Sequence, residues 1–373
     1  MLTPLLTGVG LLAVFYVIAK VCDEYFVKSL DIIAKKLKLS EDVAGATFMA
    51  IGTSAPEFAT AAIALTKVGS EQVGAGTIVG SAIFNILVIV GASSAVATAY
   101  LKWRPVVRDM GFYILSILLL LFTFRDGVIT LGEVIVYVAA YAVYIVILAF
   151  WSRWFPDYAV QKELGDIEKA MVSREKAVEK SSAFGPVARA VERALAFTFP
   201  NLEKRPGLYP LTFAISILYI IVLSWLLVEF GIAFAHSMGI PEVIIALTIL
   251  AGGTPIPDMP GSLIVARQGR GDMAVSNAVG GNTFDILVCL GLPWLVYILW
   301  TGEPMVVSTE NLLSSILLLF FTVIAMFFIL AVQKFKIGRR AGFVLLGLYA
   351  LYFCYALYGA YNPDAFPVEM LFR

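Results

Sequence analysis

The sequence has few charged side chains and very few residues that bind soft metals. Only 14% of its 373 residues are charged, His236 is the one histidine, and the three cysteines (Cys22, Cys289 and Cys354) show no paired spacing. This scarcity argues against a soft-metal site of thiolate and imidazole ligands. A net charge of zero gives no reason to expect nucleic acid as a partner. The sequence contains no nucleophile with an adjacent base, no nucleotide-binding loop and no cofactor lysine, so we expect neither enzyme activity nor a cofactor.

Apolar residues dominate instead. They make up 60% of the chain, the mean hydropathy is +0.89, and apolar blocks of about 20 residues recur along the whole length. A membrane β-barrel would show alternating segments of about 10 residues, which are not seen. The first block lacks the basic start of a secretion signal and is interpreted as a span. The composition predicts an all-α polytopic membrane protein in the lipid bilayer.

Ten apolar segments are long enough to cross a membrane. A polar segment, 153–207, divides them into an N-terminal half, 1–152, and a C-terminal half, 208–373, with five spans each. Within it, "GPVARAVERALAF" has apolar residues at helical spacing, which fits an amphipathic connector or a regulatory helix at the membrane surface. The predicted spans lie at about 4–22, 40–66, 73–99, 107–125, 129–152, 208–236, 240–266, 272–300, 310–333 and 340–361.

Basic residues gather in the loops that follow the odd-numbered spans. With the N-terminus outside, all but three of the 27 lysines and arginines lie on the cytoplasmic side; the exceptions are Lys67, Arg125 and Arg373. Cytoplasmic loops of membrane proteins are enriched in Lys and Arg. We therefore expect both termini on the non-cytoplasmic side and segment 153–207 in the cytoplasm.

Two segments share the same pair of motifs in the same order. The first contains "AIGTSAPEFATAA" and then "GTIVGSAIFNILVIVG"; the second contains "LAGGTPIPDMPGS" and then "SNAVGGNTFDILVCLG". In the first, 28 residues separate Glu57 from Asn85, and in the second, 27 separate Asp258 from Asp285. Such agreement indicates an internal duplication, with repeats at about 46–92 and 248–295.

The copies begin on the second and seventh predicted spans. Because these spans are an odd number apart, the second copy lies upside down in the membrane relative to the first. Inverted repeats with interrupted helices are typical of secondary transporters, whose binding site lies near the bilayer midplane between the repeats. Glu57 and Asp258 both fall near the middle of their spans.

Prolines beside these acids add backbone ligands. A proline donates no hydrogen bond, so Pro56 frees the carbonyl of Gly52 and Pro255 frees that of Ala251. In lipid such a carbonyl must face a cavity or an ion. The candidate ligands are then all oxygen donors, which suits small hard cations such as calcium or sodium. They are Glu57, Asp258, Asp285, Asn85, Asn282, Thr53, Ser54, Ser81, Thr254, Ala50 and Ala251.

Each candidate also has an ordinary structural interpretation. A buried acid could pair with Lys or Arg, but no basic residue falls at similar depth in any span, and an intramembrane carboxylate indicates function. Asn85 and Asn282 could join helices by hydrogen bonds, and the hydroxyl groups could bond to their own helices. The "GRGD" of 269–272 resembles a motif of intramembrane aspartyl proteases, but Asp272 falls in a charged loop, so we do not expect that enzyme.

Both repeats resemble those of the cation/calcium exchanger superfamily. "SLIVARQGRGDMAVSNAVGGNTFDILVCLGLPW" is similar to the second α-repeat of potassium-dependent sodium/calcium exchangers, and "GTSAPE" and "VGSAIFNIL" are similar to the first. The resemblance implies ten helices in two inverted five-helix halves. It implies that Glu57 and Asp258 bind calcium in alternation with sodium, and that Asp285 is the aspartate that this subfamily carries in association with potassium dependence.

Two positions depart from the family pattern. Pro255 and Gly281 stand where relatives carry serines that would bind monovalent ions. We expect an antiporter that moves calcium, together with potassium, against sodium by alternating access. An exchanger coupled to protons or potassium instead of sodium is the alternative. A cation channel is less well supported, because two inverted repeats give no fourfold symmetry.

Overall fold

The computed structural model describes residues 2–37, 50–67, 71–154, 185–200, 202, 205–255, 258–267, 271–307 and 312–361. The start of the second predicted span, the middle of the polar segment and the first two residues of the "GRGD" stretch lie outside these residues.

The described part of the first half contains ten helical segments, which make up its five spans, and two short strands. In chain order its elements are α1 (Leu2–Val21), η1 (Cys22–Phe26), α2 (Val27–Lys36), α4 (Ala50–Thr53), α5 (Ala55–Ala64), α6 (Glu71–Phe84), η3 (Asn85–Ile89), α7 (Val90–Val96), β1 (Ala99–Tyr100), α8 (Trp103–Thr123), β2 (Val128–Ile129) and α9 (Leu131–Trp154).

The second half repeats this plan after the connecting helix α11 (Gly185–Thr198) and the short turn η4 (Pro206–Leu208). Its elements are α12 (Tyr209–Met238), α13 (Glu242–Ile245), η5 (Ala246–Leu250), α14 (Ala251–Gly253), α15 (Asp258–Arg267), α16 (Gly271–Phe284), η6 (Asp285–Leu290), α17 (Gly291–Thr301), β3 (Met305–Val306), α18 (Leu312–Val332), β4 (Lys336–Ile337) and α19 (Arg339–Tyr361).

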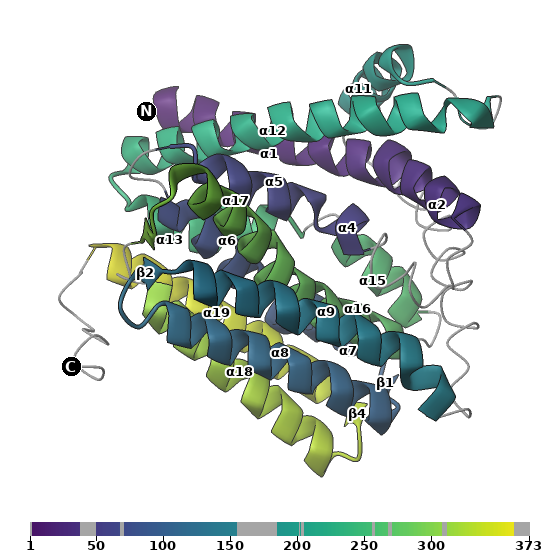
Figure 1. The fold of residues 1–373 in the computed structure, drawn as a ribbon, viewed down its shortest axis with the longest axis vertical. Coiled ribbons are helices and arrows are strands. Elements are labelled where there is room, and N and C mark those ends of the chain that lie inside the picture. Colours follow the sequence, from purple (N-terminus) through teal and green to yellow (C-terminus); the bar gives the residue numbers. More distant parts are fainter. Residues whose placement is uncertain are drawn as a thin grey trace.

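The all-α membrane fold is confirmed. Eight helices of the described chain are long and apolar enough to cross a membrane. The other two predicted spans, the second and the seventh, are the interrupted ones that carry Glu57 and Asp258. Together they account for the ten predicted segments, which Figure 1 shows packed as one bundle.

The first span is longer than predicted. Hydropathy placed its end near residue 22, but the helix runs on through η1 and α2 to Lys36. The reason is local: no glycine or proline occurs between residues 11 and 44 to end a helix. Hydropathy marks where the apolar stretch ends, and a helix with no stop signal continues beyond it.

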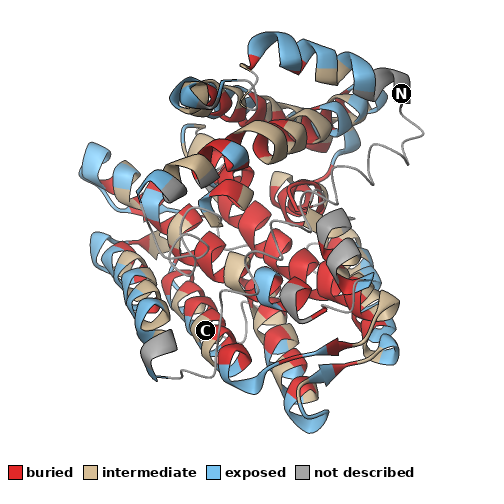
Figure 2. Ribbon diagram, turned by 90° about the vertical axis from the view of Figure 1, so that its right-hand side faces the viewer, coloured by how far each residue is buried: buried red, intermediate tan, exposed pale blue. Residues whose placement is uncertain are grey.

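The spans that carry the repeated motifs lie at the centre of the molecule. Within the segment Gln72–Val96, 94% of the most apolar window is buried, against 17% for the segment Leu131–Trp151. Figure 2 shows the same contrast, with buried residues in the middle of the bundle and exposed residues on its outside. The motif-bearing helices are therefore shielded by protein on nearly all sides, and the outer helices face lipid.

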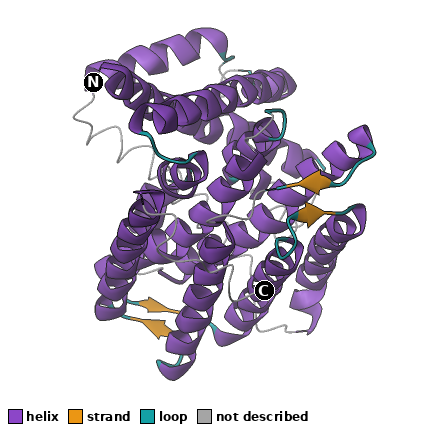
Figure 3. Ribbon diagram, turned by 90° about the vertical axis from the view of Figure 1, so that its left-hand side faces the viewer, coloured by secondary structure: helices purple, strands orange, loops and turns teal. Residues whose placement is uncertain are grey.

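Two short strand pairs join the halves crosswise. β1 follows the third span of the first half and pairs with β4, which follows the fourth span of the second half. β2, which follows the fourth span of the first half, pairs in the same way with β3, which follows the third span of the second half. β1 and β2 flank α8, whose 21 residues are about 31 Å long, so the pairs lie at opposite ends of the bundle (Figure 3). Such exchange is the arrangement that an inverted duplication produces.

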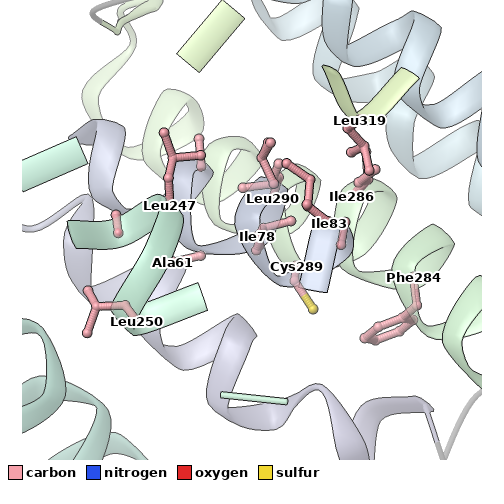
Figure 4. Packing of buried hydrophobic residues seen from close by; sticks show 14 of the residues in the cluster. Ala61, Ile78, Ile83, Leu247, Leu250, Phe284, Ile286, Cys289, Leu290 and Leu319 are labelled. Carbon is pink, nitrogen blue, oxygen red and sulfur yellow. The ribbon is translucent and has the colours of Figure 1, made fainter. Parts of the chain in front are cut away.

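Backbones of the two repeats approach closely at Gly80 in α6. A Cβ atom there would lie 2.4 Å from the carbonyl oxygen of Leu247 in η5 and 2.5 Å from the Cβ of Ala251. Figure 4 shows Leu247 near Ile78 and Ile83 of α6 in one apolar cluster. Because only glycine leaves room for this contact, the interface between the repeats depends on it.

The outer part of the bundle includes a pair of long helices, α1 and α12, which run side by side along one edge (Figure 1). The connecting helix α11 packs against this pair. Lys20 of α1 donates to Glu24 at 2.5 Å and to Glu192 of α11 at 3.0 Å. The ring of Phe199, just after α11, stacks on Tyr25 with centroids 3.9 Å apart. The predicted amphipathic segment is thus a helix that is docked on the bundle.

Candidate functional site

The second span breaks between α4 and α5. Ser54, which separates them, has φ −94° and ψ 10°, in the sparsely populated bridge region. Pro56 lies in the first turn of α5, where a helix requires no N–H donor. Glu57 lies in the same turn and is 3% exposed. The break therefore puts a carboxylate at the N-terminus of a half-helix, whose dipole favours negative charge.

The seventh span breaks at the corresponding place. α14 ends at Gly253 and α15 begins at Asp258, whose N–H donates to the carbonyl of Pro255 at 3.0 Å. Asp258, like Glu57, thus occupies the first turn of a half-helix. Two acids from inverted copies of one motif have equivalent local structure.

Asn85 and Asp285 are also structurally equivalent. Asn85 is the first residue of η3 and Asp285 is the first residue of η6, and both side chains are buried. Each begins a π-helical turn, which widens the helix and frequently occurs at functional sites. The match between the repeats extends from sequence to this unusual local geometry.

These side chains share one cavity between the repeats. Six of the eleven predicted ligands line it, and five further residues complete the wall. The lining residues are Thr53, Ser54, Glu57, Asn85, Asp258 and Asp285, with Ile89, Ser262, Asn277, Ala278 and Gly281.

The cavity extends toward the end of the bundle that carries β1 and β4. Ile89 leads through α7 to β1, and Gly271, at the start of α16, packs on Ala99 of β1. Asn277 therefore lies on the β1 side of Asp285. Ser262 lies toward the same end, because α15 runs from Asp258 to its short connection with α16.

Buried oxygen atoms without partners surround the acids. Nine buried side-chain N or O atoms of the described residues have no hydrogen-bond partner, and four of them, Glu57 Oε2, Asn85 Oδ1, Ser81 Oγ and Thr254 Oγ1, belong to predicted ligands. Most buried polar atoms in proteins are hydrogen-bonded, so four such atoms in one region need an explanation. All four are oxygen atoms that have lone pairs for a cation, although the Ser81 and Thr254 hydroxyls can also donate, and all four were predicted to be ligands.

Negative charge is concentrated here. Asp285 and Asp258 are both close enough to act electrostatically on Glu57. The thiol of Cys289 lies 3.7 Å from Asp285 Oδ1 and 3.8 Å from the carbonyl of Ser54. None of the lining residues in the described chain is Lys or Arg. Across the described residues, no group of three or more His, Cys, Asp or Glu forms a ready metal cage.

Five predicted ligands do not line this cavity: Ser81, Thr254, Ala50, Ala251 and Asn282. Ser81 and Thr254 are buried next to it with unpartnered hydroxyl oxygens. The carbonyl of Ala50 accepts from the N–H of Ser54 at 3.0 Å and from the hydroxyl of Thr53 at 3.3 Å. Thr53 therefore bonds to its own helix, as the alternative interpretation expected, and still lines the cavity.

Both the nitrogen and the oxygen of the Asn282 side-chain amide form hydrogen bonds with other residues. Its Nδ2 donates to the hydroxyl of Tyr113 at 2.9 Å and to the carbonyl of Ala82 at 3.2 Å. Its Oδ1 accepts from Asn85 Nδ2 at 2.8 Å. The structure places Asn282 behind the cavity wall as a link between helices.

Sequence reasoning did not identify Ser262 and Asn277. A signal was present, because Ser262 lies one helical turn after Asp258 and Asn277 lies one turn before Gly281, on the same helix faces. Tyr113 had no such signal, since nothing in the sequence separates it from the other 15 of the 16 tyrosines.

Comparison with known proteins agrees with the fold and the motifs. A family model described as sodium/calcium exchanger protein matches residues 7–150 and 208–358. The sodium/potassium/calcium exchanger 2 of Homo sapiens is 30% identical, over 92% of this chain and 76% of that protein. The sodium/potassium/calcium exchanger 4 of Mus musculus is 28% identical, over 97% of this chain and 82% of that protein.

Solved structures show the same fold. The sodium–calcium exchanger NCX_Mj superposes with a TM-score of 0.54 at 20% identity, over 93% of this chain and 97% of that chain. The H+/Ca2+ exchanger CAX superposes with a TM-score of 0.63 at 15% identity, over 94% and 80%. The resemblance inferred from the two repeats is confirmed: this chain belongs to the sodium/calcium exchanger family, within the cation/calcium exchanger superfamily.

Proposed function

We propose that this chain is a secondary-active antiporter that moves calcium, together with potassium, in exchange for sodium by alternating access. One observation carries the proposal: acids from two inverted repeats line a single cavity whose wall holds unpartnered oxygen atoms. The relatives named sodium/potassium/calcium exchangers support this choice of ions.

The three acids have distinct proposed roles. Glu57 and Asp258 bind calcium in one half of the cycle and sodium in the other. Asp285 supplies the charge that accompanies potassium. Three carboxylates balance one divalent and one monovalent cation, which lowers the cost of holding the ions inside the membrane. Asn85, Thr53 and Ser54 contribute neutral oxygen atoms from the same wall.

The absence of a ready metal cage among the described residues fits a carrier. Glu57, Asp258 and Asp285 belong to three different elements, α5, α15 and η6. A transported cation must be released on each cycle, so its ligands have to separate. We propose that they close around the cation only when these elements move together, and that the cations are cargo of a carrier that is not an enzyme.

We further propose how the chain lies in the membrane. The bias of Lys and Arg supports both termini on the non-cytoplasmic side and a cytoplasmic segment 153–207 between the halves 1–152 and 208–373. The cavity, which extends toward β1 and β4, would then face the cytoplasm.

A second coupling is favoured by one specific observation. Gly281 lines the cavity, and a Cβ atom built on it meets nothing within 4 Å. The hydroxyl that relatives would present here is therefore absent and its space is open. Together with Pro255, this supports coupling to protons or potassium instead of sodium as the alternative.

Flux across reconstituted vesicles tests the proposal. Calcium uptake should require an outward sodium gradient, should rise with potassium on the calcium side, and should not respond to a proton gradient alone. Uptake driven by a proton gradient would contradict the proposal and would indicate the alternative coupling. Uptake that does not depend on any counter-ion gradient would also contradict it and would indicate a channel.

Two variants tie the flux to the cavity. Glu57→Gln removes one charge and one anionic ligand from the wall, so calcium uptake should fall to the level of empty vesicles. Glu303→Gln neutralises an exposed acid just before β3 that does not line the cavity, and uptake should persist. Wild-type flux in Glu57→Gln would exclude this residue as a ligand.

Restoring a hydroxyl tests the role of Gly281. Because the space is open, Gly281→Ser should fold normally and should strengthen the dependence of calcium uptake on the sodium gradient. Gly111→Ala, on the outside of α8 with nothing within 4 Å of its Cβ, is the control and should change nothing. An unchanged sodium dependence in Gly281→Ser would show that this position does not set the coupling.

A further inference from the structure

The amide of Asn85 has only one orientation consistent with its neighbours. Asn282 contacts the carbonyl of Ala82, which can only accept a hydrogen bond, so the Asn282 atom at 3.2 Å from it must be Nδ2. The Oδ1 of Asn282 then faces Asn85 and requires a donor, which is Asn85 Nδ2 at 2.8 Å. The remaining atom, Asn85 Oδ1, is buried without a partner in a residue that lines the cavity.

Tyr113 completes the contacts that hold this arrangement. Asn282 has two amide hydrogens; one goes to Ala82, and the other goes to the hydroxyl of Tyr113 at 2.9 Å. Tyr113 and Asn282 are both 0% exposed, so no solvent can replace that acceptor. Tyr113 lies on α8, Asn282 on α16, and Ala82 and Asn85 on the third span, so the contacts join three helices.

We propose that Tyr113 is a positioning residue for cation binding: through Asn282 it holds the Asn85 amide so that its oxygen faces the cavity. Tyr113 touches no cation itself. The inference rests on the proposed function only in taking the cavity as the cation site, and it adds a residue outside both repeated motifs. It also gives Asn282 a role that does not require it to be a ligand.

Loss of the Tyr113 hydroxyl should weaken cation binding without unfolding the protein. In Tyr113→Phe, one buried amide hydrogen of Asn282 has no acceptor, and a buried donor left without a partner is costly. Asn282 can then turn away from Asn85, which releases the Asn85 oxygen from its fixed position. We expect about a three- to tenfold loss of affinity with the maximal transport rate little changed.

Tyr137 provides a matched control. It is also 0% exposed, and its hydroxyl makes a hydrogen bond of 3.2 Å to Thr123, which like Tyr113 lies on α8. The change Tyr137→Phe removes the same atom from the same degree of burial, but Tyr137 does not line the cavity or contact Asn282 in the described structure. It should leave cation affinity unchanged.

The experiment is equilibrium binding of Ca²⁺, Na⁺ and K⁺, each alone, to the purified full chain. The variants are Tyr113→Phe, Tyr137→Phe, Asn85→Ala and the double variant Tyr113→Phe/Asn85→Ala. The double variant should bind as weakly as Asn85→Ala alone, because Tyr113 acts only through the Asn85 oxygen. The midpoint of thermal unfolding in ion-free buffer is recorded for each variant.

Each outcome is decisive. Equal losses in the two Tyr→Phe variants, additive losses in the double variant, or a lowered unfolding midpoint with unchanged affinity would overturn the positioning role. Binding of Na⁺ or K⁺ but not Ca²⁺ would contradict the proposed function, and a Tyr113-specific loss for those ions would still support the positioning role. Binding of none of the three ions would remove both claims.

Discussion

At the residue scale, the site contains buried oxygen atoms that have no hydrogen-bond partner among the described residues. Two belong to residues that line the cavity, Glu57 and Asn85, and two belong to predicted ligands that do not line it, Ser81 and Thr254. A folded protein gains nothing from such atoms, since each one forfeits the hydrogen bonds it made with water. They are consistent with a site whose missing partner is a cation.

Asp285 gives the first prediction at this scale. Asp285→Asn replaces the carboxylate by the amide that stands at the equivalent position, Asn85, in the other repeat. Without this carboxylate, the site lacks the negative charge that balances the monovalent cation. Potassium stimulation of calcium uptake should therefore be lost, while some exchange remains. Vesicle uptake at varied potassium concentration measures this, with Glu303→Gln, an exposed acid outside the cavity, as the control. A full potassium response in Asp285→Asn would exclude the assigned role.

Residue type and spacing predicted most of the acidic wall but not the residues that support it. Glu57, Asp258 and Asp285 could be identified because a carboxylate in an apolar span is costly and therefore conspicuous. Tyr113 could not, because a buried tyrosine is ordinary and its partner, Asn282, lies 169 residues away. Such a contact is set by how three helices cross, and one sequence does not show that.

Elements, and the breaks within them, place these residues. The proline motifs predicted that the second and seventh spans would be interrupted, and both are. The sequence did not predict that the second half-helix of each span begins at the turn that contains the acid. It also did not predict the π-helical turns η3 and η6. These depend on packing between the repeats, because a widened turn is stable only where neighbours fill the space beside it.

Gly80 tests that packing. A methyl group added by Gly80→Ala would meet backbone and Cβ atoms of η5 and α14 at 2.4–2.5 Å, and backbone cannot yield as a side chain can. We expect the variant to be destabilised by about 1–3 kcal/mol, seen as a lower midpoint of thermal unfolding in detergent. Gly111→Ala has open space and should be neutral or slightly stabilising. Equal midpoints for both variants would show that α6 does not depend on this contact.

At the scale of the whole molecule, the two halves form an inverted pair around a cavity that extends to one end. The ten segments and their duplication were predicted from the sequence, and the crossed strand pairs were not, because two-residue strands leave no periodic signal. The end toward which the cavity extends also depends on the conformational state, and a sequence shared by both states cannot indicate it.

Accessibility from the two sides of the membrane tests this description. Asn277 is exposed and lines the cavity on the β1 side, so Asn277→Cys should react with a membrane-impermeant thiol reagent from one side only. Arg104→Cys, next to β1, marks that side and should react from it as well. Reaction of the two variants from opposite sides would contradict the placement of the cavity mouth. Native Cys354 is exposed and must first be replaced.

The crossed strands have a mechanical consequence. The strand pairs β1–β4 and β2–β3 join the two halves at both ends of α8. The helices that these strands link are therefore expected to move as one rigid body. Neither strand pair involves α1 or α12, so we expect this helix pair to be the part that can slide past the rest of the bundle. Lys67, just beyond α5, forms an ion pair with Glu229 of α12. Sliding would separate these two charges. Because salt weakens the attraction between them, ionic strength should change the rate at which the cavity switches from opening on one side of the membrane to opening on the other.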